Sequence, residues 1–138
     1  MQASTIRNVL IVDDHEYNHV YLEHLLACPA IRLLHARNGQ EALAIAEAER
    51  PDLVLTDVCM PKMDGLELCD AIRHNPALAS TRVILLSAVV GEDTLSDSAD
   101  ELGANGYFAK PFNEDAVRRG VDQVLGGVGL GARVARTR

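Results

Sequence analysis

Five short apolar segments run through the chain, each separated from the next by a longer stretch of mixed character. Most are continuously apolar rather than alternating, which is typical of strands in a parallel sheet that is covered on both faces. The predicted strands are residues 8–14, 31–36, 52–57, 82–88 and 106–110.

The stretches between and after these strands carry apolar residues at helical spacing, most clearly at 21–26, 68–72, 95–102 and 117–125. Asn38 with Glu41, and Asp64 with Glu67, have the spacing of capping boxes, and Gly103 is placed to end a helix. Strand and helix thus alternate five times. Because crossovers between parallel strands are right-handed, the pattern predicts an α/β, (βα)5 three-layer sandwich.

Length and composition narrow the class of protein. A chain of 138 residues with 48% hydrophobic content suits one domain around one core. Its longest apolar stretch, 83–90, is far shorter than the ~20 residues of a membrane span, so we expect a cytoplasmic protein without a membrane partner. The net charge of −7 and the 4% aromatic content argue against direct binding of nucleic acid.

Two further features concern the thiols and the C-terminal end. Cys28, Cys59 and Cys69 show neither disulfide nor zinc spacing, so free thiols are expected. We expect the folded domain to span 1–126 and the Gly/Arg-rich residues 127–138 to form a flexible tail or linker, too short for an output module.

Polar side chains gather where the predicted strands end. Asp13 and Asp14 follow the first strand, Asp57 ends the third, Ser87 ends the fourth and Lys110 ends the fifth. Singly, an aspartate there can cap a helix, the serine can be a strand-end hydroxyl and the lysine can be solvated. Since the carboxyl ends of parallel strands share one edge, where ligands bind, their joint placement indicates a site.

The charges at this edge indicate its chemistry. Two carboxylates ~4 Å apart repel by about 4 kcal/mol at an effective dielectric near 20. The three pairwise repulsions among three ionised and unpaired carboxylates would therefore approach ~12 kcal/mol. A hard divalent cation such as Mg²⁺ offsets that repulsion and leaves positions for a substrate. Metal, ammonium and hydroxyl together can neutralise a phosphoryl group in transfer, with Asp57 as the accepting nucleophile.

Four motifs carry a resemblance to a known family: VDD at 12–14, LTDVCMPKMDG at 55–65, LSA at 86–88 and GANGYFAKPF at 103–112. From about residue 8 to 125 the chain resembles the receiver domain of two-component response regulators and hybrid histidine kinases. The resemblance implies a flavodoxin-like fold with strand order 2-1-3-4-5.

The resemblance also implies a metal site. Asp14 and Asp57 would bind Mg²⁺ directly, Asp13 would act through water, and the backbone carbonyl of Cys59 would be a further ligand. Receiver domains take a phosphoryl group from a phosphohistidine of a sensor kinase or a His-containing phosphotransfer protein, and pass a signal to a downstream protein. Beyond self-phosphotransfer and slow self-dephosphorylation, no enzymatic activity is expected.

For the phosphoryl group, the resemblance makes Asp57 the acceptor. Ser87 Oγ and the Ala88 N–H would bind its oxygens, and Lys110 would pair with them. The bond before Pro111 is commonly cis in receivers, which would orient the lysine.

Two expectations concern the lifetime and the effect of the phosphate. Cys59 and Val89 offer no strong polar group to orient an attacking water, so hydrolysis should be slow. Phosphorylation should draw Ser87 toward the phosphate and let Tyr107 turn inward, changing the face formed by 92–102, 106–110 and 114–125.

Three other classes of protein are alternatives to a phosphorylated receiver. A haloacid-dehalogenase-type phosphatase needs a second acid at position 59, which is Cys. An FMN carrier needs a phosphate loop after the first strand, where the acidic DDHEYN at 13–18 would repel a phosphate. A degenerate receiver that binds partners without phosphorylation is the more serious alternative, although every chemical position is filled.

Overall fold

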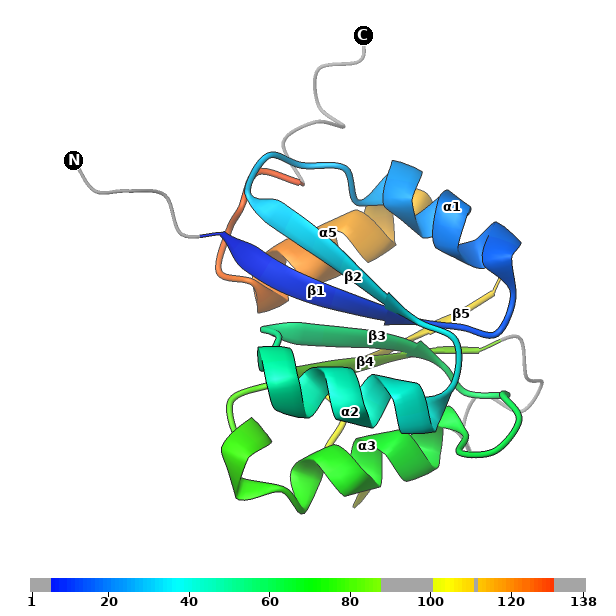
Figure 1. The fold of residues 1–138 in the computed structure, drawn as a ribbon. Helices are drawn as coiled ribbons and strands as arrows, with labels where there is room; N and C mark the ends of the chain where they lie inside the picture. The colour runs from blue at the N-terminus through cyan, green and yellow to red at the C-terminus, as the bar shows by residue number, and fades with distance from the viewer. Residues whose placement is uncertain (1–5, 88–100, 111, 131–138) are drawn as a thin grey trace, which may run out of the picture.

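The computed structural model describes residues 6–87, 101–110 and 112–130, and it contains a five-stranded parallel sheet between two layers of helices (Figure 1). The sheet order is β2-β1-β3-β4-β5, which confirms the predicted α/β architecture and strand order. The strands are β1 (Arg7–Val12), β2 (Ile31–Ala36), β3 (Leu53–Asp57), β4 (Arg82–Ser87) and β5 (Gly106–Ala109). The described helices are α1 (Glu16–Leu25), α2 (Gly39–Glu49), α3 (Gly65–Arg73), the 3₁₀ turn η1 (Pro76–Leu78) and α5 (Glu114–Val124). The helix expected over 95–102 lies mostly outside the described residues.

The core consists of two layers because neighbouring residues of each strand point to opposite faces of the sheet. Leu10 and Val54 pack on the side of α2 and α3, whereas Ile11 and Leu55 pack on the side of α1 and α5. Figure 1 shows these two helix pairs on opposite faces of the sheet. Both faces are buried, which explains why the strands are continuously apolar.

The two predicted capping boxes differ in the structure. At α3, the Asp64 carboxylate accepts from the Glu67 N–H at 2.8 Å and the Glu67 carboxylate accepts from the Asp64 N–H at 3.0 Å, so the box is complete. At α2, Asn38 accepts from the Glu41 N–H, but the Glu41 carboxylate accepts from the N–H of Arg37 instead. The second box is therefore only half formed.

Gly65 allows α3 to begin directly against the end of β3. Its N–H donates to the carbonyl of Val58 at 2.8 Å. A Cβ at position 65 would overlap the carbonyl oxygen of Asp57 and lie 2.9 Å from the Cα of Val58. Glycine is thus required by the close approach of two backbones, and this approach holds the strand end that carries Asp57.

The chain stays packed for several residues after α5. One carboxylate oxygen of Asp122 accepts from the N–H groups of 128, 129 and 130 at 2.8, 3.0 and 3.0 Å. Leu130 is fully buried, and Cys28 donates to the carbonyl of Val128. The expected domain boundary at 126 falls within this turn, and residues 131–138 lie outside the described part. Among the described residues, no helix combines the length and apolar character needed to cross a membrane.

Candidate functional site

Backbone pairing brings the predicted site residues to one edge of the sheet. Asp57 is the last residue of β3 and pairs in register with Leu86 of β4. The Lys110 N–H, just after β5, donates to the carbonyl of Ser87 at 2.7 Å. The carboxylate, the hydroxyl and the ammonium therefore come from three adjacent strand ends.

Lys110 is shared between two buried carboxylates. Its Nζ lies 3.3 Å from Oδ1 of Asp57 and 3.9 Å from Oδ2 of Asp13, and the two acids are 7% and 1% exposed. A pair at 3.3 Å has a gross attraction of about 5 kcal/mol at an effective dielectric near 20. One ammonium thus faces two acids, with Asp14 on the same loop, and the negative charge is not fully compensated.

The proton affinity of Asp57 reflects this imbalance. Burial raises the pKa of the Asp57 carboxyl above its usual 3.8, and the charges of Asp13 and Asp14 act in the same direction. Lys110 lowers the pKa but does not cancel the increase. A carboxylate in this environment gains from an additional cation.

The loop after β1 presents its acids to the site and does not use them to cap α1. Helix α1 starts at Glu16 with His15 at the N-cap, so the N-cap interpretation of Asp13 or Asp14 is wrong. The Asp13 carboxylate instead accepts from the His15 N–H at 2.9 Å and from the Asn18 side chain at 3.1 Å.

His15 is a site residue that the sequence analysis did not identify. One ring nitrogen of His15, one carboxylate oxygen of Asp13 and one of Asp14 lie within 4.8 Å of one another, close enough to ligate one metal ion. The available signal was its position directly after two strand-end aspartates. Oδ1 of Asp14 is buried and accepts no hydrogen bond from any described residue. Carboxylates in this state fit a hard divalent cation such as Mg²⁺.

A pair of histidines, one of them buried, supports the backbone of this loop. His19, 1% exposed, places Nε2 2.8 Å from the carbonyl oxygen of Asp13 and Nδ1 2.7 Å from Nδ1 of His35. His35 in turn reaches the Glu23 carboxylate at 2.8 Å. Burial, followed by the neighbouring His19, lowers the pKa of His35, while Glu23 opposes the change. The pair links Asp13 to the outer strand β2.

Several predicted positions are described only in part. Ala88, Val89 and Pro111 lie outside the described residues, as does most of the face expected at 92–102. Cys59 is exposed and follows the strand end by two residues. Tyr107 is half-buried and packs against the core layer on the side of α2 and α3.

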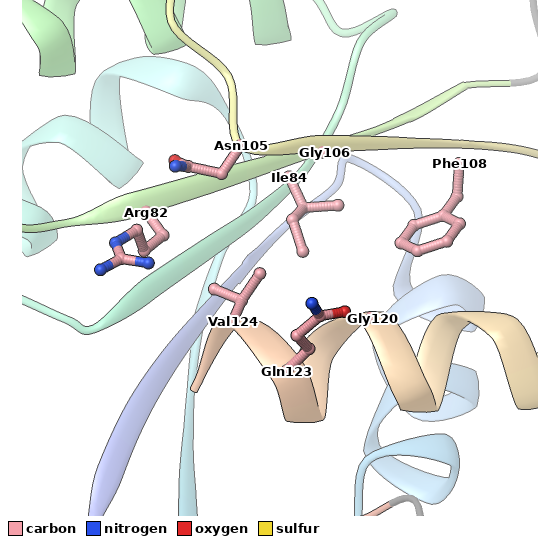
Figure 2. A pocket seen from close by; sticks show the side chains of 8 residues that line it. All are labelled: Arg82, Ile84, Asn105, Gly106, Phe108, Gly120, Gln123 and Val124. Carbon is pink, nitrogen blue, oxygen red and sulfur yellow. The ribbon is translucent and has the colours of Figure 1, made fainter. Parts of the chain in front are cut away.

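A separate cavity of about 400 Å³ lies between α5 and the parts of β4 and β5 near their N-terminal ends. Figure 2 shows Arg82 and Asn105 at one end and Phe108 near Gly120 at the other. Because Arg82 begins β4 whereas Ser87 ends it, the cavity is away from the acidic edge. Among the described residues, its lining contains one charged side chain and no carboxylate, so we do not assign it to the candidate site.

Comparisons with known proteins agree with this geometry. Residues 9–122 match the response regulator receiver domain family. The chain is 38% identical over 117 residues to sporulation initiation phosphotransferase F of Bacillus subtilis. This alignment covers 85% of the chain and 92% of that protein. It is 34% identical over 119 residues to the PhoP regulatory protein of alkaline phosphatase synthesis of B. subtilis, covering 86% of this chain but only 48% of that protein. The structure of the chemotaxis protein CheY4 of Vibrio cholerae superposes with a TM-score of 0.78 at 29% identity, covering 87% of this chain and 99% of that one.

Proposed function

Because the chain belongs to the response regulator receiver domain family, whose members are signalling modules of two-component systems, we propose that Asp57 accepts a phosphoryl group from a phosphohistidine donor. The observation that carries the proposal is the buried Asp57 carboxylate 3.3 Å from Lys110 at the end of the central strand. Sensor kinases or His-containing phosphotransfer proteins are the proposed donors, and a downstream protein is the proposed recipient of the signal.

In the proposed transfer, an Asp57 oxygen attacks phosphorus as the P–N bond to the donor imidazole breaks, and the bonding pair stays on the leaving nitrogen. Lys110 lies close enough to the Asp57 carboxylate to pair with it before the transfer and with the phosphoryl oxygens afterwards. The Ser87 hydroxyl, with the Ala88 N–H, would bind the remaining oxygens. The imidazole leaves as a neutral ring when its other nitrogen carries a proton, which belongs to the donor, so this chain need not supply one.

Receiver domains generally bind Mg²⁺ in an acidic pocket, and the donor set here suits that ion. Asp14 and Asp57 would hold it directly, Asp13 through water, and the Cys59 carbonyl would complete the protein ligands. When bound, the ion neutralises charge on the carboxylates and on the phosphoryl oxygens.

Acetyl phosphate with Mg²⁺, followed by mass mapping of the adduct, tests the acceptor. We expect one phosphoryl group on Asp57 in the wild type and none in Asp57→Asn, with Asp70→Asn labelled normally as a matched control. Labelling of Asp57→Asn at the wild-type yield would refute the assignment. No labelling of the wild type would favour a receiver that binds partners without phosphorylation.

We expect the proposed aspartyl phosphate at Asp57 to hydrolyse slowly. Hydrolysis needs a water held in line with phosphorus, and the side chains at 59 and 89 cannot orient one. Introducing Asn at 59 and Glu at 89 should accelerate phosphate release several-fold, whereas an unchanged rate would show that another step limits hydrolysis.

The proposed switch couples Ser87 to Tyr107. With a beryllofluoride mimic and Mg²⁺, NMR signals of Ser87, Tyr107 and the 92–102 segment should shift together. Ser87→Ala should uncouple the latter two while leaving part of the Asp57 chemistry intact. Shifts confined to the acidic site would show phosphate binding without a switch.

A further inference from the structure

His15 occupies a helix N-cap without capping the helix. N-cap residues are usually Ser, Thr, Asp or Asn, whose side chains accept from N–H groups of the first turn. Asn38, Asp64 and Asn113 do so at α2, α3 and α5, but the His15 side chain makes no such bond at α1. Its ring instead faces the two aspartates before it.

The distances at this ring are compatible with a shared metal ion, and the convergence of the ring nitrogen with two carboxylates distinguishes it from a simple ion pair. His15 Nδ1 lies 3.2 Å from Oδ1 of Asp14 and 3.5 Å from Oδ1 of Asp13. A charged N–H···O pair is usually about 2.7–2.9 Å. Two ligands on one ion at ~2.1 Å lie about 3.0 Å apart in octahedral and about 3.4 Å apart in tetrahedral geometry. The observed 3.2 and 3.5 Å are close to these ligand-to-ligand separations.

The Asp14 carboxylate also has an oxygen that can take a further partner. Oδ1 of Asp14 is a buried atom, and no described residue donates a hydrogen bond to it despite the ring 3.2 Å away. With its proton on Nε2, His15 Nδ1 offers a lone pair toward Oδ1 of Asp14, and a cation can then join the two atoms. Imidazole nitrogen suits borderline transition ions, whereas Mg²⁺ prefers oxygen and releases its waters reluctantly.

We propose that His15 Nδ1 is a direct metal ligand alongside Asp14, which makes this acidic site selective for divalent transition ions such as Co²⁺ or Zn²⁺ relative to an all-oxygen receiver site. The proposal rests on the metal site of the proposed function. It assigns to His15 a preference among ions and leaves Mg²⁺ binding to the carboxylates.

Calorimetric titration of the 138-residue chain with Co²⁺ and with Mg²⁺ tests the proposal. His15→Ala should weaken Co²⁺ binding by about tenfold or more and change the Mg²⁺ affinity by less than about threefold. His74→Ala is the matched control, because His74 Nδ1 lies at the same 3.2 Å from Oδ1 of Asp70 on the exposed surface of α3. That variant should leave both affinities unchanged.

Nitrogen-15 NMR of the imidazoles provides a readout that is independent of affinity. On adding Zn²⁺, the Nδ1 resonance of His15 should shift as expected for direct coordination, and the shift should be lost in Asp14→Asn. A Co²⁺ to Mg²⁺ affinity ratio that is the same in His15→Ala and wild type, or an unshifted ring nitrogen, would leave only an ion pair at this position and overturn the proposal. If Asp14→Asn still lost Mg²⁺ in that case, the proposed function would stand. Failure of the wild type to take up Mg²⁺ or to label Asp57 would instead count against the proposed function.

Discussion

Replacing Asp57 by Asn should stabilise the metal-free protein at neutral pH. The amide keeps the size of the side chain and can still accept from Lys110, but it removes a buried charge that lies near Asp13 and Asp14. Lys110 attracts Asp57 with a gross energy of about 5 kcal/mol at 3.3 Å and an effective dielectric near 20. The raised pKa of Asp57 nevertheless shows that burial and the neighbouring acids outweigh this attraction.

The expected gain follows from that balance. Single substitutions commonly change stability by about 0.5–3 kcal/mol, and this one removes an unfavourable buried charge, so we expect Asp57→Asn to increase the free energy of unfolding by roughly 1–2 kcal/mol at pH 7.5. For a chain of this size, that corresponds to a rise in Tm of about 3–8 °C. Mg²⁺ should stabilise the wild type more than the variant, because binding to the folded state alone increases stability and the variant lacks one ligand.

The pH dependence gives the sign of the effect. A folded-state pKa above the unfolded 3.8 means that the folded protein holds the Asp57 proton more tightly. This contribution is fully present below pH 3.8 and is lost as the pH rises through the folded value. The advantage of Asp57→Asn should therefore be largest at neutral pH and shrink as the pH falls toward 3.8.

Urea unfolding monitored by circular dichroism, in the presence of a chelator, measures this difference. Asp70→Asn is the control, because the Asp70 side chain is 51% exposed and its loss should change stability by less than about 0.5 kcal/mol. A destabilised Asp57→Asn protein at pH 7.5 would show that the Lys110 pair dominates, and it would refute the argument for an uncompensated negative site.

Three other predictions concern the supporting structure. Gly65→Ala should lower the free energy of unfolding by about 3 kcal/mol or more and impair labelling of Asp57, because the new Cβ meets the backbone at the end of β3; denaturant unfolding and acetyl phosphate labelling measure both effects. The lowered pKa of His35 makes the unfolded state bind its proton more readily, so wild-type stability should fall as the pH drops through 6.5 and His35→Gln should reduce this loss; urea titrations at pH 7.5 and 5.5 test the sign. Asp122→Ala should cost about 1–3 kcal/mol and increase hydrogen exchange at the amides of 128–130, and unchanged exchange there would contradict the role of this carboxylate.

The strands and the acidic edge could be predicted because they depend on local patterns. The predicted strand 31–36 is reproduced without change, and 52–57 differs from β3 by one residue. Asp57 and Lys110 could be placed together because parallel strands end at a common edge, even though 53 positions separate them. The capping box at Asp64 could also be predicted, because its two partners lie only three residues apart in the sequence.

The remaining features depend on contacts through space that no local pattern specifies. The sequence does not mark His15 as a site residue, because an imidazole at an N-cap has no characteristic spacing and its direction toward the acids is visible only in three dimensions. The contact of His19 with His35 depends on the packing of α1 beside β2, and the half-formed box at Asn38 depends on where Arg37 presents its N–H. The sequence by itself determined the order of elements, the apolar core and the identity of the strand-end chemistry, because periodicity and chain direction are properties of neighbours along the chain. Only the tertiary structure decided which side chains share a hydrogen bond or an ammonium, because those energies depend on distances of 3–4 Å between residues that lie far apart in the sequence.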